Sequence, residues 1–131
     1  MAGVKLDGAG VQKLKTLEEA VTQVQRVHGI VETYALALKR KQPTTNYGMQ
    51  IKRVLPPLVG LLKGQFGLIS DQVAALYLVV GRGSNEQTRI RVLREGVGSI
   101  RQALDIAAVR VKENHAVKDE VAESEGGTAS G

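Results

Sequence analysis

The amino-acid sequence predicts an all-α fold, specifically a four-helix up-down bundle with a kinked or split second helix. The 131 residues include no Cys and no Trp, one Phe and three Tyr, so the core must be built from Leu, Val, Ile and Ala. Such a core suits helices packed along apolar seams better than an aromatic-rich β-sandwich. Two long segments repeat apolar residues at steps of three and four, which is the spacing of one helix face. Gly and Pro punctuate the segments between them, as expected for the ends of helices.

The first predicted helix covers residues 11–39. Its apolar seam follows steps of three and four residues and consists of Leu14, Leu17, Val21, Val24, His28, Val31, Ala35 and Leu38. Ala20, Val27 and Tyr34 widen this seam on one flank, which is typical of a bundle helix rather than a two-stranded coiled coil. Basic residues in the last turn complement the exposed carbonyls, and Pro43 follows as a stop.

The two histidines need separate interpretations. His28 occupies a seam position where Leu or Val would be usual, so we interpret it as a neutral, hydrogen-bonded histidine in the core or at its edge. Burial there would lower its pKa. His115 lies where the last helix meets the C-terminal segment, and the sequence shows nothing that would fix its side chain. Neither histidine is therefore interpreted as catalytic.

Two shorter apolar elements fill residues 47–82. The first has helical spacing interrupted by Pro56 and Pro57, and because proline in a helix interior removes a hydrogen bond, we expect a bend or a split there. A loop at residues 64–67 follows. Ser70 is then predicted to cap a helix over residues 71–80.

The last predicted helix covers residues 85–113. Its seam again follows steps of three and four and consists of Ile90, Leu93, Val97, Ile100, Leu104, Ala107 and Val111. Ser84 and Gln87 fit a capping box at its start. Gly96 and Gly98 lie inside the helix, so we expect them to permit close approach of a neighbouring helix or a local bend.

The domain organisation and charge follow from composition. Residues 1–10 are predicted to be a flexible N-terminus, residues 11–116 the bundle domain, and residues 117–131 a disordered acidic tail. The net charge of +5 is uneven, because residues 39–116 contain 13 Lys or Arg against five acids. The first ten residues resemble neither a signal peptide nor a transit peptide, so we expect the cytoplasm, with the nucleus as the alternative.

Several function classes are poorly supported by these residues. The lack of Cys excludes disulfide scaffolds, thiolate metal sites and cysteine nucleophiles. No nucleophile-elbow motif and no metal-ligand spacing is present, so we expect no enzyme, no cofactor and no metal site. The run Gly81-Arg82-Gly83-Ser84 lacks the Walker Lys-Ser/Thr pair and is interpreted as a helix-to-helix turn.

The apolar stretch over residues 54–80 is long enough to be considered as a membrane-spanning segment. It is interrupted by two prolines and by a Ser-Asp helix start, so it holds no uninterrupted run long enough for a transmembrane helix. An inserting hairpin and the two most buried helices of a bundle both fit the same composition.

Two function hypotheses follow. The first is a non-enzymatic protein-interaction module, an adaptor or scaffold that binds another protein through an acidic surface or helix of that partner. The alternative is a polyanion-binding module that uses the basic half, residues 39–112, to bind nucleic acid, anionic phospholipid or an acidic protein surface. The binding residues expected first are Arg89, Arg91, Arg94 and Arg101, followed by Lys39, Arg40, Lys41, Lys52 and Arg53. We expect the turn after the first helix to bring the second group near one end of the last helix.

Overall fold

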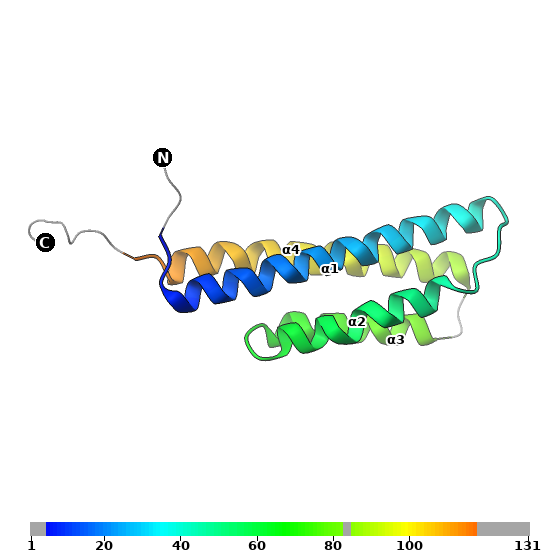
Figure 1. Cartoon of the computed structure of the whole chain (residues 1–131). Helices are drawn as coiled ribbons and strands as arrows, with labels where there is room; N and C mark the ends of the chain where they lie inside the picture. Colours follow the sequence, from blue (N-terminus) through cyan, green and yellow to red (C-terminus); the bar gives the residue numbers. More distant parts are fainter. Residues whose placement is uncertain (1–4, 83–84, 118–131) are drawn as a thin grey trace, which may run out of the picture.

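The computed structural model describes residues 5–82 and 85–117, which fold into four antiparallel α-helices (Figure 1). The helices are α1 (Gly8–Lys39), α2 (Tyr47–Lys63), α3 (Gly67–Gly81) and α4 (Glu86–Asn114). Within these residues the only strand-like pairing is a single antiparallel bridge between Leu6 and Ala116. The predicted all-α four-helix bundle is therefore confirmed.

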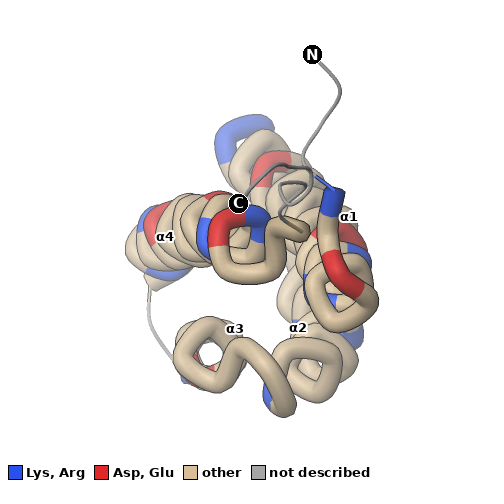
Figure 2. The backbone as a smooth tube through the Cα atoms, turned by 90° about the vertical axis from the view of Figure 1, so that its left-hand side faces the viewer, with Lys and Arg blue, Asp and Glu red and all other residues tan. Residues whose placement is uncertain are grey.

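The four helices occupy the corners of a square (Figure 2). α1 packs against α2 and α4, and α3 packs against the same two helices, so every contact is between neighbours around the square. Short connections favour this arrangement because each helix turns back along the one before it. α2 and α3 carry few charged residues, which are Lys52, Arg53, Lys63 and Asp71.

The core is a single apolar cluster drawn from all four helices. The predicted seam of α4 is buried along almost its whole length, with only Ala107 partly exposed. In α1 the buried residues are Gly10, Leu17, Ala20, Val24, Val27, Val31, Tyr34 and Ala37.

The flank predicted at Ala20, Val27 and Tyr34 is confirmed as buried, whereas four residues of the predicted seam are only partly buried against the core, which are Leu14, Val21, Ala35 and Leu38. Leu17, Val24 and Val31 share the buried face with the residues three positions later in the chain, whereas the predicted seam used the residues four positions later. Val27 and Tyr34 bury more apolar surface than the competing residues of the predicted seam, so this face turns to the core. The prediction that His28 lies in the core is wrong, because its side chain is exposed.

The second helix is not split. α2 runs unbroken through Pro56 and Pro57, and both prolines lie on the exposed face, where water can reach the carbonyls that lose their amide donors. The predicted cap at Ser70 is also wrong. Ser70 is buried inside α3, which begins at Gly67, and its hydroxyl donates a hydrogen bond to the carbonyl of Val59 at 3.0 Å.

The start of α4 is capped by a side chain, and one of its glycines allows close contact with α3. Asn85 caps the helix by accepting a hydrogen bond from the Thr88 amide at 3.0 Å, whereas the predicted cap, Ser84, lies outside the described residues. Gly96 faces Leu76 of α3 so closely that a methyl group would meet its side chain at 2.6 Å. The close approach expected at Gly96 is confirmed, while Gly98 has open space around it.

The helices differ in length, and this gives the bundle two unlike ends. α1 and α4 have 32 and 29 residues, whereas α2 and α3 have 17 and 15. At a rise of about 1.5 Å per residue, the longer pair extends roughly 20 Å past the shorter pair. The connections between α1 and α2 and between α3 and α4 lie at one end, so the extension lies at the other, beside the chain termini (Figure 1).

The chain termini are held together at the extended end. Asp7 caps α1 by accepting a hydrogen bond from the Gly10 amide at 2.7 Å, and its own amide donates to the carbonyl of His115 at 3.0 Å. α1 thus begins at Gly8, inside the segment predicted to be flexible. Residues 1–4 and 118–131 lie outside the described part, so the flexible N-terminus and the acidic tail stay predictions for them.

Candidate interaction site

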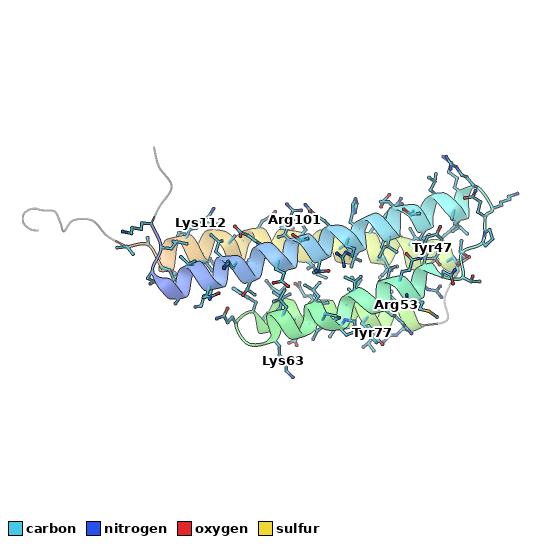
Figure 3. All side chains as sticks on the ribbon, viewed as in Figure 1. Tyr47, Arg53, Lys63, Tyr77, Arg101 and Lys112 are labelled. Atoms are coloured by element: carbon cyan, nitrogen blue, oxygen red, sulfur yellow. The ribbon has the colours of Figure 1, made fainter. Side chains whose placement is uncertain are left out.

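Most of the predicted basic residues gather at the closed end of the bundle, where the α1–α2 and α3–α4 connections lie. Residues 32–53 and 82–95, which build this end, contain nine Lys or Arg and three Glu. As expected, the turn after α1 is brought near the start of α4, where Lys39, Arg91 and Arg94 border one shallow hollow. Figure 3 shows Arg53 toward this end and Arg101 farther along the bundle, so Arg101 does not belong to the basic end.

Two of the predicted arginines are engaged in ion pairs within the chain. Arg94 donates two hydrogen bonds to the Glu32 carboxylate, both at 2.7 Å, which joins α4 to α1. This pairing lowers the pKa of Glu32 and raises the pKa of Arg94. Arg101 pairs with Asp105 one turn later at 3.3 Å. Neither pair supports these arginines as open contacts for an external anion.

Arg89 belongs to a network centred on Glu86. The Glu86 carboxylate accepts hydrogen bonds from the Tyr34 hydroxyl at 2.8 Å and from the Thr44 hydroxyl at 2.7 Å. Arg89 donates to the Tyr34 hydroxyl at 3.3 Å, and Tyr34 stacks on Tyr47 with ring centroids 5.4 Å apart. Hydrogen bonds from Thr44 and Tyr34 lower the pKa of Glu86, while burial and then the bond to Glu86 raise the pKa of Tyr34.

The second group of predicted residues is more open. Arg40 and Lys41 are exposed at the end of α1, as is Lys39. Arg53 is also exposed, and its guanidinium donates a hydrogen bond to the Met49 sulfur of the same helix at 3.5 Å.

Lys52, the last of that group, is partly buried against α3. Its ammonium lies over the Tyr77 ring, 5.7 Å from the centroid. This cation–π contact joins α2 to α3.

His115 is held firmly, contrary to the sequence-based expectation. Its Nδ1 lies 3.1 Å from the Asp7 carboxylate and its Nε2 lies 3.2 Å from the Lys13 ammonium. A methyl group on Gly10 would meet the His115 Cβ at 2.5 Å, so the two chain ends approach more closely than any other residue would permit. The prediction that nothing fixes His115 is wrong, and the contacts that fix it come from Asp7 and Lys13, which lie 108 and 102 residues away in the chain.

A groove of about 730 Å³ lies where α4 continues past the α2–α3 hairpin. The α2–α3 loop and the first turns of α3 form one wall, and the last turns of α4 form the other. In Figure 3, Lys63 marks the end of α2 and Lys112 marks the part of α4 that continues past it. The groove therefore exists because the two helix pairs have unequal lengths.

The groove has an apolar surface and a basic rim. Leu68 is 84% exposed and Ile106 is 48% exposed, although both are large apolar residues. Among the described residues that line it, Lys13 and Arg110 are the two Lys or Arg residues, and none is a carboxylate. Arg110 forms no ion pair within residues 5–82 and 85–117.

Sequence reasoning missed this groove. Ile106 lies off the predicted α4 seam, so its apolar character was the available signal. Whether Ile106 is exposed, however, depends on where the α2–α3 hairpin ends along α4. That position follows from the lengths of the helices, and a sequence gives helix ends only to within one or two residues.

Within the described part of the chain, no group of three or more His, Asp or Glu side chains could hold a metal ion. No helix of that same part is both long and apolar enough to cross a membrane. No family model, no curated protein and no solved structure matches this chain.

Proposed function

We propose that this protein is a non-enzymatic interaction module, an adaptor or scaffold that binds a partner protein in the groove between α3 and α4. The observation that carries the proposal is the exposed apolar surface of that groove, where Leu68 and Ile106 face solvent at the end of an otherwise well-buried core. Apolar surface gathered in a concave site favours association, because covering it removes that surface from water.

The lining residues of the groove are also arranged as in a helix-binding site. α4 lines one side with residues spaced as along one helix ridge, and the α3 start lines the other. A helix from a partner can lay an apolar face between two such ridges, as in other helix-in-groove complexes.

The test compares two substitutions of matched exposure. Ile106→Glu places a charge in the groove, and Leu36→Glu places one at a similarly exposed apolar site on α1, the two native side chains being 48% and 43% exposed. Both variants should keep the helical circular dichroism of the unchanged protein. In affinity capture from cell extract, the proposal expects a protein that is retained by the unchanged chain and by Leu36→Glu and is lost with Ile106→Glu. An identical set of bound proteins for all three would overturn it.

Polyanion binding is a second candidate function, and the charge imbalance of the closed end favours it. Exposed Lys39 borders one hollow with exposed Arg91, and exposed Arg40 and Lys41 follow Lys39 in the chain. No acid in the described residues pairs with Arg91. A phosphate-rich ligand bound there would release counterions, so its affinity should fall log-linearly with salt.

The test of this second candidate uses Arg40→Glu with Arg91→Glu, and Lys112→Glu as the control. Titration with a duplex DNA and with vesicles containing phosphatidylserine should give binding that the double variant abolishes and the control keeps. The candidate fails if the unchanged protein binds neither ligand at low salt.

A further inference from the structure

We propose that the occupant of the groove is an acidic amphipathic helix of another protein, a proposal that rests on the proposed interaction function. The partner segment would place apolar residues on the groove surface and Glu or Asp side chains against Lys13 and Arg110. This assignment names both the secondary structure and the charge of the partner.

The shape of the groove selects a helix. Ala103, Ile106, Ala107 and Arg110 line it at the spacing i, i+3, i+4 and i+7, which forms a single ridge along α4. The alanines on this ridge let a partner backbone approach closely, and the extension of α4 past the hairpin, roughly 20 Å, matches a helix of about 13 residues.

The charge of the groove selects an acidic helix. Lys13 lies against His115, with Nζ and Nε2 3.2 Å apart, and no carboxylate of the described residues forms an ion pair with it. Arg110 lies on the α4 side and forms no ion pair in the described chain. Because the described lining of the groove contains Lys13 of α1 and Arg110 of α4 and no carboxylate, an acidic helix is attracted by both cations, and a basic helix is repelled by both.

Defined peptides test the charge separately from the groove. Three helical peptides of about 16 residues share one apolar face and carry Glu, Gln or Lys at the flanking positions. Fluorescence anisotropy with the full chain measures their affinities at low salt. We expect the Glu peptide to bind about tenfold more tightly than the Lys peptide, since rim charges act mainly through complementarity and are screened by salt.

Two variants of α4 locate the effect. Arg110→Glu should reduce or reverse the preference for the Glu peptide, whereas Lys112→Glu, an exposed residue outside the groove lining, should leave it unchanged. Ile106→Glu should weaken all three peptides. Circular dichroism of each variant checks that the bundle remains folded.

The outcomes distinguish a failure of the acidic-helix proposal from a failure of the proposed groove function. Equal affinities for the three peptides, all lost with Ile106→Glu, overturn the acidic partner and leave the groove function standing. No binding of any peptide overturns both. A large gain in affinity on removing residues 118–131 overturns the external partner in favour of the chain's own acidic segment. A concentration-dependent dimer that Ile106→Glu abolishes overturns it in favour of a second copy.

Discussion

Glu86 joins three separate segments of the chain at the closed end, because its carboxylate accepts hydrogen bonds from two residues far from it in sequence. Its carboxylate binds Tyr34 of α1 and Thr44 of the α1–α2 connection, and these bonds hold its pKa below the ordinary 4.5. The folded state therefore binds this proton less readily than the unfolded state. The resulting stabilisation is complete above pH 4.5 and is lost as the pH falls through the lower folded value.

Glu86→Gln should remove that pH dependence. At pH 7 we expect the variant to lose about 1–3 kcal/mol of unfolding free energy, the usual contribution of hydrogen bonds to a charged group. Urea unfolding at pH 7 and pH 3.5 should show a smaller acid-induced loss for Glu86→Gln than for the unchanged protein. Glu95→Gln, at an exposed position of the same helix, is the control and should keep the original pH dependence. Equal pH dependence in Glu86→Gln would contradict the assignment.

Two glycines in helices make opposite predictions for the same substitution. Gly98→Ala has open space around its new methyl group, so it should raise stability by about 1 kcal/mol through helix propensity alone. Gly10→Ala would place a methyl group 2.5 Å from the His115 Cβ, so it should lower stability by separating the two chain ends. Thermal melts of the two variants measure the difference. Stabilisation by Gly10→Ala would show that the chain ends are not closely packed.

At the scale of the helices, the sequence predicted which segments are helical but not all of their ends and faces. The α4 seam was correct because its apolar residues form one unambiguous stripe from Ile90 to Val111. The α1 face was predicted with Val27 and Tyr34 at its flank instead of its centre, because Val24 and Val31 fit two seams and only the packing of α2 and α4 chooses between them. Ser70 resembles a cap by composition, but its hydroxyl instead bonds to α2, which no local pattern reveals.

For the candidate sites too, the sequence predicted some features and not others. The gathering of basic residues at one end follows from chain order, because the end of α1 and the start of α4 must meet in an antiparallel bundle. The ion pair of Arg94 with Glu32 could not be predicted from chain order, since it joins residues 62 positions apart. Predicting the groove would have required the relative lengths of the two helix pairs. Those lengths depend on helix boundaries that sequence patterns place only within a few residues.

The end of α1 offers a prediction about an element boundary. Lys41 has a φ of 57°, in the left-handed region, and the amide of Gln42 bonds back to the Ala37 carbonyl at 2.9 Å. This is a Schellman motif, whose left-handed position favours Gly. Lys41→Gly should therefore raise stability by about 1 kcal/mol, since Gly avoids the strain of a side chain there.

A matched substitution checks that explanation. Lys39→Gly lies in the last helical turn, so it should lower stability by about 1 kcal/mol through lost helix propensity. Differential scanning calorimetry of both variants measures the two shifts. A decrease in melting temperature for Lys41→Gly would contradict the motif.

At the scale of the whole molecule, truncations test how much of the chain the fold needs. Ala116 pairs with Leu6, and the Val117 amide donates to the Lys5 carbonyl at 2.8 Å. Truncation after Val117 removes a segment with few apolar residues, so we expect no change in melting temperature. Truncation after Asn114 also removes His115 and its contacts with α1, so we expect a decrease of several degrees. Equal melting temperatures for the two truncations would show that the paired chain ends contribute little.

The two candidate functions place the ligand at opposite ends of the bundle, so one mapping experiment separates them. Uniformly ¹⁵N-labelled full-length protein can be titrated with the Glu-flanked helical peptide while the backbone amide shifts are followed by NMR. Groove binding predicts the largest shifts in the first turns of α3 and the last turns of α4, with the closed end unchanged. Shifts confined to residues 39–53 and 82–94 would contradict the groove as the binding site.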